Sequence, residues 1–327
     1  MSKYKIVISD YYYPNIDQEL HVFESLGDDV EIVDCTKVFP GGAKSPEQLS
    51  PIVRDADALI VQFAQVNAEV IEAMQRCKVI ARYAIGVDTI DIEAATKKGI
   101  HVANVPDYCI DEVANTAIGH LLNAMRKISL SRDLLLRGEF SMDAINPIKR
   151  MCDSTLCLLG FGNIARNVYL KSKHLFGNIV AYDPYFPNKE DFPDVVFLPL
   201  EEALAQADAI SIHVPLNKAT REMISQREFR LMKNGVILVN TARGGLINEQ
   251  ALLEALETGR VGFCGLDVLN SEDFKQSPFL RHPNVCLTPH IGWNSEGALL
   301  ELQRKTAENV VSALENGQPT YCVNCGG

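Results

Sequence analysis

The sequence predicts an α/β protein built from two doubly wound parallel-sheet domains. Its candidate strands are near-continuous apolar runs, as expected for parallel strands that are covered on both faces. These runs alternate with helical patterns, which is typical of a parallel sheet with crossover helices. A chain of 327 residues also fits two domains of about 100–200 residues each.

The first strand–helix series occupies the first third of the chain. Its predicted strands are Lys5–Ser9, Val30–Asp34, Ala58–Val61, Val79–Arg82 and His101–Val105. From Pro106 onward the period changes, because apolar residues recur at intervals of three and four between Val113 and Met125. This spacing predicts a long helix with one buried stripe.

A second strand–helix series runs from Thr155 to about Leu287. Its predicted strands span residues 155–160, 178–183, 208–215, 235–242, 261–268 and 285–290. Beyond Ser295 the pattern is helical again to about Leu314. We therefore predict one domain formed by residues 1–105 and 295–327, and a second domain, residues 106–294, inserted into the first.

Charge and hydropathy argue against nucleic acid and membranes as partners. The net charge is −11, and no stretch of the chain is basic. No run approaches the roughly 18 apolar residues of a membrane span. The start, MSKYKIVISD, resembles a first strand and lacks the long apolar core of a signal peptide. We expect a cytoplasmic protein that acts on a small molecule.

The cysteines predict no metal site. There are nine, and many lie inside apolar runs, which is typical of reduced thiols in the cytosol. Cys322 and Cys325 form a single C-x-x-C near the C-terminus. Because neither a second pair nor histidines accompany it, we interpret this motif as a pair of surface thiols rather than a zinc site.

A candidate nucleotide loop lies at Gly160–Ala165, with the sequence GFGNIA. The G-x-G-x-x-A pattern alone also fits a structural turn, but here it follows a predicted strand and opens a predicted helix. Gly160 allows a tight turn, and Gly162 lets a pyrophosphate approach the backbone. Ala165 permits close packing of helix on strand, while the helix N-terminus supplies amides to the phosphates.

An acidic residue in the next strand completes the dinucleotide pattern. Asp183 ends that strand, 23 residues after Gly160, where an acid accepts hydrogen bonds from the adenosine ribose. An acid at this place repels a 2′-phosphate, and no arginine follows directly in Asp183-Pro184-Tyr185. These residues predict NAD rather than NADP as the cofactor.

Three reactive residues follow apolar runs of the second series: Arg243, Glu272 and His290. Residues just beyond the carboxyl ends of parallel strands line the ligand crevice of an open sheet. Arginine can bind a carboxylate through two hydrogen bonds, and histidine suits proton transfer near neutral pH. A carboxylate on the far imidazole nitrogen would favour the protonated ring. Structural alternatives are that Arg243 caps a loop, Glu272 is a solvated acid and His290 is a packed strand-end residue.

The sequence resembles the D-isomer-specific 2-hydroxyacid dehydrogenase family over nearly its whole length. The stretches that carry the resemblance are RYAIGVDTIDIEAATKKGIHVANVPDYCIDEVA, LLGFGNIA, HVPLNKAT, MKNGVILVNTARGGLINEQAL, GLDVLNSE and LTPHIGW. Several long motifs in the same order are far more specific than one alone. The resemblance implies that residues 106–294 form a Rossmann NAD domain, inserted into a flavodoxin-like substrate domain.

The resemblance also implies roles for single residues. Arg243 would bind the carboxylate and carbonyl oxygen of the substrate, Glu272 would pair with the imidazole, and His290 would be the acid/base. Substrate contacts would further come from the backbone amides of Ile85 and Gly86. The expected cofactor contacts are Gly160, Phe161, Gly162, Asn163, Ile164, Ala165, Asp183, His213, Val214, Pro215, Ala219, Thr241, Ala242, Gly292 and Asp267, the last facing the nicotinamide carboxamide.

Two positions depart from the family pattern, and two others each have two interpretations. Asn115 and Ala117 stand where the family usually has an acid and a threonine, which puts in doubt any cofactor contact carried over there. Trp293 either limits substrate size as a pocket wall or has a packing role. Arg82 either adds a second positive group near the far end of the substrate or extends its charged end from a strand terminus to water.

These observations together predict an NAD-dependent oxidoreductase that interconverts a 2-oxo acid and a D-2-hydroxy acid. The resemblance further implies a homodimer, commonly built by the long helix after Pro106. An alternative from another class is an NAD(H)-sensing, corepressor-like binding protein, because such proteins share the fold, the catalytic residues and the tryptophan. A formate-type dehydrogenase is less favoured, because His290 is followed by Ile291 rather than glutamine.

Overall fold

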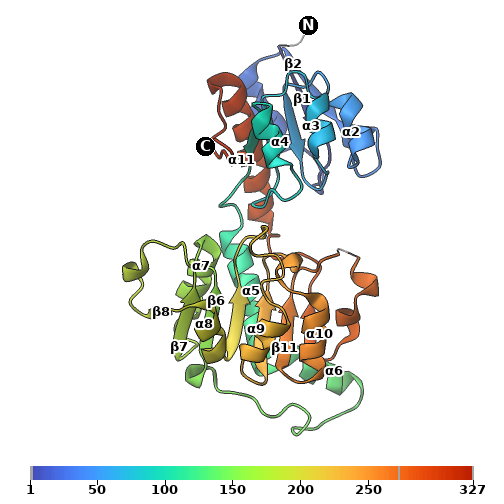
Figure 1. Cartoon of the computed structure of the whole chain (residues 1–327). Coiled ribbons are helices and arrows are strands. Elements are labelled where there is room, and N and C mark those ends of the chain that lie inside the picture. The colour runs from blue at the N-terminus through green and yellow to red at the C-terminus, as the bar shows by residue number, and fades with distance from the viewer. Residues whose placement is uncertain (1–2, 272, 326–327) are drawn as a thin grey trace. The chain divides into compact units, whose positions relative to one another are not determined.

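The computed structural model describes residues 3–271 and 273–325. The chain divides into two compact units, each an α/β sandwich (Figure 1). The first unit contains Met1–Tyr108 and Ser295–Gly327, and the second contains Cys109–Asn294. The chain therefore leaves the first unit once and returns to it once.

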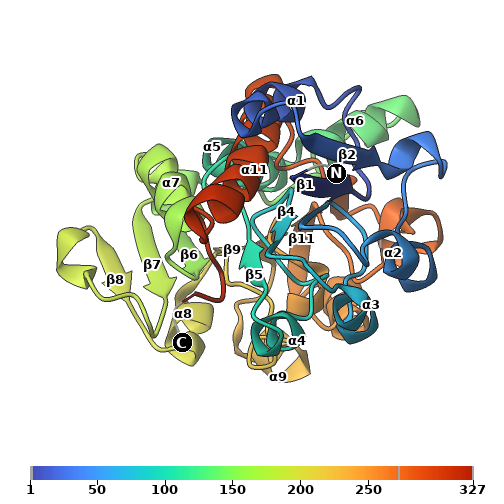
Figure 2. The ribbon, with the colours of Figure 1, turned by 90° about the horizontal axis from the view of Figure 1, so that it is seen from above.

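The first unit has a five-stranded parallel sheet in the order β2-β1-β3-β4-β5. Its strands are β1 (Tyr4–Ile8), β2 (Val30–Asp34), β3 (Ala58–Val61), β4 (Val79–Arg82) and β5 (His101–Ala103). Its helices are α1 (Asp17–Phe23), α2 (Pro46–Ile52), α3 (Ala68–Ala73), α4 (Ile92–Lys97) and α11 (Glu296–Asn316). Helices α1 and α11 cover one face of the sheet, and α2, α3 and α4 cover the other (Figure 2).

The second unit has a seven-stranded parallel sheet in the order β12-β11-β10-β9-β6-β7-β8. Its strands are β6 (Thr155–Leu159), β7 (Asn178–Tyr182), β8 (Val195–Phe197), β9 (Ala209–Ile212), β10 (Val236–Asn240), β11 (Val261–Leu266) and β12 (Val285–Leu287). Its helices are α5 (Ile110–Arg126), α6 (Ile128–Leu136), α7 (Asn163–Ser172), α8 (Leu200–Gln206), α9 (Gln226–Leu231) and α10 (Glu249–Glu257). Helices α5 and α7 pack on one face, and α8, α9 and α10 pack on the other.

Local sequence signals set the helix ends. Helix α11 begins after Ser295, whose hydroxyl oxygen accepts a hydrogen bond from the Ala298 amide at 3.0 Å, and it ends at Gly317 in the left-handed region. Helix α2 begins with a capping box between Ser45 and Gln48, with Pro46 in its first turn. These caps satisfy amide groups that a helix terminus otherwise leaves unpaired.

The structure confirms the predicted fold class. Three predicted strands have the observed bounds, and the others differ by a few residues at their ends. The five-stranded order is the flavodoxin-like one, and the seven-stranded order is that of a Rossmann sheet with one added strand. The prediction omitted β8, because Val195–Phe197 is a three-residue edge strand beside prolines and too short to show a pattern.

The strand order of the second sheet reverses between β6 and β9, which are neighbours in the sheet. From β6 the chain continues to β7 and β8 toward one edge, and from β9 it continues to β10, β11 and β12 toward the other edge. Ligands bind at such a switch point, outside the carboxyl ends of the strands. The loops that begin at Gly160 after β6 and at His213 after β9 therefore start at the place where the fold favours a nucleotide.

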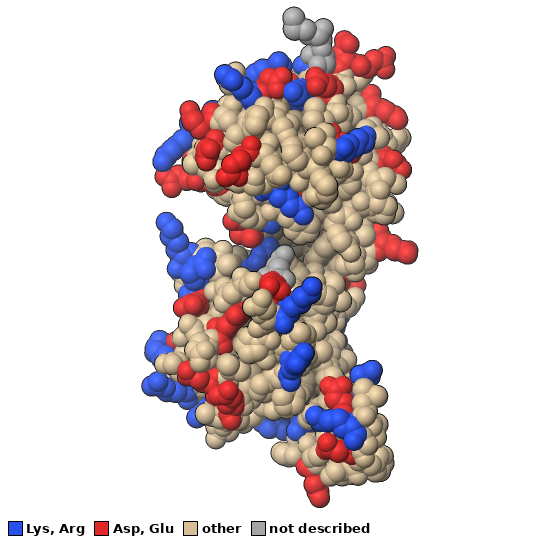
Figure 3. Space-filling view, turned by 90° about the vertical axis from the view of Figure 1, so that its right-hand side faces the viewer, with Lys and Arg blue, Asp and Glu red and all other residues tan. Residues whose placement is uncertain are grey.

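Surface charge and helix hydropathy add two observations. Acidic and basic side chains are interspersed on the face drawn in Figure 3, so charge of one sign does not dominate there. Within residues 3–271 and 273–325, no helix has both the length and the apolar character needed to cross a bilayer.

Candidate active site

The loop after β6 has the backbone geometry that a dinucleotide needs. Gly160 has φ of 88°, and a Cβ there would lie 2.9 Å from the carbonyl carbon of His213, so only glycine fits. Gly162 precedes the first turn of α7, and a Cβ at this residue would meet no atom within 4 Å. The space beyond the N-terminus of α7 is thus open to a phosphate, which the helix amides and dipole favour.

The buried ring of Phe161 fixes the loop Gly160–Ala165 to the core of the second unit. Phe161 is fully buried and contacts the rings of Phe186, Phe192 and Phe197 edge to face, with centroid distances of 4.9–5.2 Å. Such ring pairs add directional stabilisation to the burial of apolar area. The packing of Phe161 therefore also fixes the backbone of Gly160 and Gly162, which have no side chains of their own to pack.

Asp183 lies directly after β7 and ties the nucleotide loop to the next strand. Its carboxylate accepts hydrogen bonds from the amides of Phe161 at 2.9 Å, Tyr185 at 2.9 Å and Phe186 at 3.0 Å. A carboxylate offers about four lone-pair directions, so these three bonds leave room for a ribose hydroxyl. The negative charge at this place is the feature that disfavours a 2′-phosphate.

The loop after β9 carries a neutral histidine. The amide of His213 donates to the Leu159 carbonyl at 2.7 Å, and its Nε2 lies 2.8 Å from the Ser211 hydroxyl. Burial lowers the pKa of His213 to about 4, so the imidazole is uncharged at neutral pH. Val214, Pro215 and Ala219 follow in the same loop, which Asn217 closes by accepting from the Ala219 amide at 2.8 Å.

Arg243 lies in a loop that a buried asparagine folds. The side chain of Asn240, at the end of β10, donates to the Arg243 carbonyl at 2.9 Å and accepts from the Ala242 amide at 3.0 Å. The guanidinium of Arg243 donates to the Ala242 carbonyl at 2.8 Å. The Thr241 hydroxyl is buried and has no hydrogen-bond partner among the described residues. An unpaired buried hydroxyl at the carboxyl end of β10, the neighbour of β9, fits a contact with a bound dinucleotide.

His290 lies in a loop that is folded around the carboxylate of Asp267. This carboxylate is 1% exposed and accepts from the Thr288 hydroxyl at 2.6 Å, the Ile291 amide at 3.0 Å and the Gly292 amide at 2.8 Å. The backbone of Asp267 also accepts from the His290 amide at 2.8 Å. The contact of Asp267 with the nicotinamide that the resemblance implies stays a prediction. In the structure, its carboxylate holds the segment that carries His290.

A second histidine extends this network. Nε2 of His120, on α5, lies 3.1 Å from the Thr288 hydroxyl oxygen. Since Thr288 gives its own proton to Asp267, it accepts the hydrogen bond from His120, which fixes the Nε2–H tautomer. Burial lowers the pKa of His120, although the nearby Asp267 charge opposes this shift. A Cβ on Gly265 would lie 2.7 Å from that of His120, so glycine makes room for the ring.

The loops after β10, β11 and β12 therefore form one connected set. The amide of Asp267 donates to the Asn240 carbonyl at 3.0 Å, which links the loop of Arg243 to the loop of His290. A Cβ on Gly244 would lie 2.1 Å from the Leu269 carbonyl carbon, so these loops touch through their backbones. The structure thus brings the loops of Arg243 and His290 together with Asp267, as strand-end residues of adjacent strands.

Other predicted site residues have the following places. Glu272 lies outside the described residues. Trp293 is half-buried in the turn that follows Gly292. A Cβ added to Gly292 would lie 2.8 Å from the Asp267 carboxylate. Asn163, Ile164 and Ala165 form the first turn of α7.

In the first unit, Arg82 has a visible structural role. Its Nη1 donates to the Gly86 carbonyl at 2.9 Å and to the Asp88 carboxylate at 3.2 Å. The Ile85 carbonyl accepts from the side chain of Asn104 at 2.6 Å. Arg82 and Asn104 therefore fold the loop that carries the Ile85 and Gly86 amides.

Sequence reasoning missed Asn240, Thr288 and His120. Asn240 had a weak signal, because an asparagine that ends an otherwise apolar strand needs partners for its amide. The polar contacts of Thr288 and His120 join segments 168 residues apart and had no local signal.

His213 in the β9 loop generates a pH prediction. Because the folded-state pKa of His213 is about 4 and its ordinary value is 6.5, the unfolded chain binds a proton more readily between these values. The contribution of neutral His213 to the unfolding free energy is complete above pH 6.5, and it is lost as the pH falls toward about 4. His213→Gln should flatten this part of the pH dependence of the unfolding free energy, measured by urea denaturation.

His174→Gln, at an exposed histidine on the same unit, is the matched control and should leave the profile unchanged. Parallel pH profiles for wild type and His213→Gln would contradict the assignment. His120 shifts in the same direction, so some acid sensitivity should persist in the variant.

Comparison with known proteins identifies the family of this chain. The family model described as D-isomer specific 2-hydroxyacid dehydrogenase, NAD binding domain, matches residues 118–292, more than half of the chain. The hydroxypyruvate reductase of Thermotoga maritima is 38% identical over 272 residues, which cover 82% of this chain and 87% of that protein. The D-3-phosphoglycerate dehydrogenase of Methanocaldococcus jannaschii is 36% identical over 323 residues.

This second match covers 98% of this chain but spans only 59% of the length of the Methanocaldococcus protein. Among solved structures, a glyoxylate reductase from Paecilomyes thermophila superposes with a TM-score of 0.87 at 28% identity, covering 99% of both chains. The open N-terminus of α7, Asp183 and the unpaired Thr241 hydroxyl fit the NAD that the matching model describes. The chain therefore belongs to the D-isomer-specific 2-hydroxyacid dehydrogenase family.

Proposed function

We propose that this protein is an NAD-dependent dehydrogenase that interconverts a 2-oxo acid and a D-2-hydroxy acid. The observation that supports this most is the connected set of loops after β10, β11 and β12. In these loops Asn240 folds the segment of Arg243, and Asp267 folds that of His290, beside the loops that suit a dinucleotide. A fixed cation and an imidazole are the groups that a small carboxylic acid and one mobile proton require.

NAD, when bound, supplies or accepts the hydride. The residues proposed to hold it are Gly160 and Gly162 at the pyrophosphate, Asp183 at the adenosine ribose and Thr241 through its buried hydroxyl. The neutral His213 adds no charge to this region at neutral pH. The Arg166 guanidinium does bring a positive charge to the loop, where it donates to the Phe161 carbonyl at 3.1 Å. The repulsion of a 2′-phosphate is therefore assigned to the Asp183 carboxylate alone.

Arg243 is proposed to bind the substrate carboxylate. Its guanidinium keeps its charge at any working pH and presents donors in a planar fork that matches a carboxylate. The overall charge of −11 repels small anions at long range, so a local fixed cation is needed to hold one. Ile85 and Gly86 are proposed to add backbone amides to the same carboxylate, and Trp293 to limit the size of the group beyond C2.

His290 is proposed to move the proton at the substrate oxygen. In reduction it protonates the oxygen on C2, and in oxidation it takes that proton back. Its backbone lies in the left-handed region at φ of 53°, where a non-glycine residue persists only when its surroundings hold it. The Asp267 carboxylate and carbonyl supply that constraint. Glu272 is proposed as the acid that keeps the imidazole charged.

His290→Ala tests the acid/base assignment. Loss of the proton carrier should lower turnover by about 10²–10⁴-fold, while NADH binding, measured by fluorescence, stays near its wild-type level. The rate is measured as NADH oxidation with a panel of 2-oxo acids that includes glyoxylate, hydroxypyruvate and pyruvate. His174→Ala, at an exposed histidine, is the control and should keep full activity.

Near-native turnover of His290→Ala would contradict the assignment. Inactivity of the wild-type protein with every 2-oxo acid, together with tight NADH binding, would instead favour a dinucleotide-sensing binding protein. The panel therefore separates the two classes of function that the sequence left open.

Asp183→Ala tests the cofactor preference. Loss of one hydrogen bond to a charged group, worth about 1.5–3 kcal/mol, should weaken NADH binding roughly 10–100-fold, while NADPH binding weakens less or improves. Binding constants for both cofactors are measured by fluorescence titration. Asp191→Ala changes a nearby exposed acid and should leave the ratio of the two constants unchanged. A preserved NADH preference in Asp183→Ala would remove the charge argument.

A homodimer is the proposed assembly, with α6 and the segment after it as the contact. Five large apolar side chains are exposed there: Ile128, Leu135, Leu136, Phe140 and Met142. The apolar stripe of α5, by contrast, packs on the sheet of its own unit. A cluster of exposed apolar side chains typically marks a protein interface, and the family resemblance favours a second copy as its partner.

Leu136→Asp should convert the dimer to a monomer at micromolar concentration, measured by size-exclusion chromatography with light scattering. Burying an unpaired carboxylate in an apolar contact is strongly unfavourable. Leu170→Asp, at an equally prominent exposed leucine on α7, is the control and should leave the assembly unchanged. A monomeric wild-type protein would contradict the proposed assembly.

A further inference from the structure

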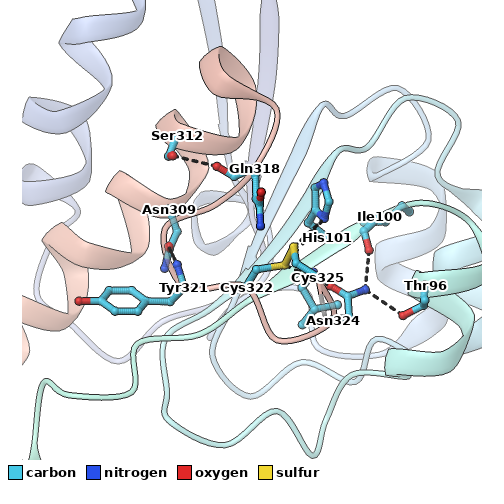
Figure 4. Close-up of a disulfide and its surroundings, with 11 residues drawn as sticks. Thr96, Ile100, His101, Asn309, Ser312, Gln318, Tyr321, Cys322, Asn324 and Cys325 are labelled. Atoms are coloured by element: carbon cyan, nitrogen blue, oxygen red, sulfur yellow. Dashed lines mark hydrogen bonds between the residues drawn. A yellow bond between two sulfur atoms is a disulfide. The ribbon is translucent and has the colours of Figure 1, made fainter. Parts of the chain in front are cut away.

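The segment after α11 docks on the edge of the first sheet. The Val323 amide donates to the Val102 carbonyl at 2.8 Å, and the Asn104 amide donates to the Tyr321 carbonyl at 3.3 Å. Cys322 pairs with Ala103 of β5 in an antiparallel bridge. The segment is thus held along β5, and Figure 4 shows Cys322 and Cys325 beside His101 of that strand.

Side chains other than the cysteines fix this docking. Asn324 accepts from the Val102 amide at 2.8 Å and donates to the Thr96 hydroxyl at 2.9 Å and to the Ile100 carbonyl at 3.0 Å. The Tyr321 amide donates to the side chain of Asn309 at 2.9 Å. Contacts other than the bond between the two cysteines therefore hold their segment beside β5.

The C-x-x-C brings its two sulfur atoms against a histidine of β5. Cys322 and Cys325 are joined in a disulfide. Nδ1 of His101 lies 3.2 Å from Sγ of Cys325 and 3.8 Å from Sγ of Cys322 (Figure 4). Cys325 is exposed, whereas Cys322 is half-buried. The sequence predicted free surface thiols without a histidine, because His101 lies more than two hundred residues earlier in the chain.

The other cysteines are in different environments. Among the cysteines outside this pair, Cys152 is the exposed one. Burial raises the pKa of the Cys35 thiol to about 11 and that of Cys77 to about 12, so these thiols stay protonated and unreactive. Cys157 and Cys264 shift in the same direction through burial. Solvent access and a neighbouring base thus coincide at the C-terminal pair.

We propose that Cys322, Cys325 and His101 form a thiol–disulfide exchange site for a small-molecule disulfide of the glutathione type. Cys325 is the attacking residue, because it is exposed and lies closer to the imidazole. Cys322 is the resolving residue, because it is shielded and within bonding reach of Cys325. The site uses none of the residues proposed for hydride transfer, so it stands or fails independently of that function.

The exchange balances in two steps. His101 takes the thiol proton of Cys325, and the thiolate attacks one sulfur of the small disulfide. A mixed disulfide forms, and one small thiolate leaves with the proton from His101. The Cys322 sulfur then attacks Cys325, so that the Cys322–Cys325 bond forms and the second small thiol leaves with the Cys322 proton. The protein dithiol is oxidised, and one small disulfide is reduced to two thiols.

A rival chemistry for the same three groups is a thiophilic metal ion, since their candidate donor atoms lie within 4.8 Å of one another. The structure favours exchange over metal binding, because the disulfide occupies both sulfur atoms. The two can be told apart, because a bound metal would protect both thiols from alkylation and from oxidation.

The test uses the full chain in buffers with graded ratios of reduced to oxidised glutathione. After rapid alkylation, peptide mass spectrometry counts the labels on the C-terminal peptide. We expect a reversible change between two labels and none as the ratio falls, while Cys152 keeps its label in the reducing half of the series. A C-terminal peptide that keeps both labels at every ratio would overturn the proposal, and so would zinc that co-purifies stoichiometrically and blocks labelling.

Three variants assign the roles. Cys322→Ser should accumulate a mixed disulfide with glutathione on Cys325, because no resolving thiol remains, whereas Cys325→Ser should form at least about tenfold less on Cys322. His101→Gln should slow alkylation of reduced Cys325 about tenfold at neutral pH, because the imidazole no longer takes the thiol proton. The two rates should converge in strongly alkaline buffer, where hydroxide takes the thiol proton without the imidazole.

Cys152 in the same molecule is the internal reference, and its alkylation rate should not respond to His101→Gln. Equal rates for Cys325 in wild type and His101→Gln at neutral pH would overturn the role of the imidazole. Equal accumulation of mixed disulfide in the two serine variants would overturn the order of attack.

Discussion

The buried carboxylate of Asp267 is the group on which the arrangement of the site depends. It accepts three hydrogen bonds from the segment of residues 288–292, and its backbone binds both His290 and Asn240. Hydrogen bonds to a charged group contribute about 1.5–3 kcal/mol each. That stabilisation exceeds the cost of about 1–3 kcal/mol for a non-glycine residue in the left-handed region, where His290 lies. Without the carboxylate, the segment that carries His290 would lose these three hydrogen bonds.

The fold was predictable because parallel strands covered on both faces are written as continuous apolar runs. Val30–Asp34, Ala58–Val61 and Val79–Arg82 are such runs, and the structure has strands with these bounds. An apolar run no longer marks a strand where only part of the strand is buried. β8 has three residues at a sheet edge, and only Val195 is buried among them. The ends of β5 and β9 were predicted too long, because the apolar run continues into the loop after the last ladder hydrogen bond.

The candidate site was predictable in part, for a related reason. Reactive side chains just after apolar runs mark strand ends, and Arg243 and His290 are at those places. The residues that hold them are not marked in this way, since Thr288 and His120 meet only through the folded sheet. The same limit applies to His101, whose imidazole meets sulfur atoms more than two hundred residues away. Local patterns show which groups can react, whereas long-range contacts decide which groups position them.

The division of the chain has a consequence for the order in which it folds during synthesis. The second unit is one continuous stretch, Cys109–Asn294, and its contacts are complete once that stretch has left the ribosome. The first unit is discontinuous, because α11 covers β3, β4 and β5 and is translated after the whole second unit. Glu19, buried in α1, bonds Gln303 of α11 across 284 residues of sequence. Until α11 is translated, the strands of the first unit therefore have one face covered by α1 alone, and closing so long a loop is entropically costly. The first unit is therefore the part of this chain whose apolar surface a chaperone would shield longest during synthesis.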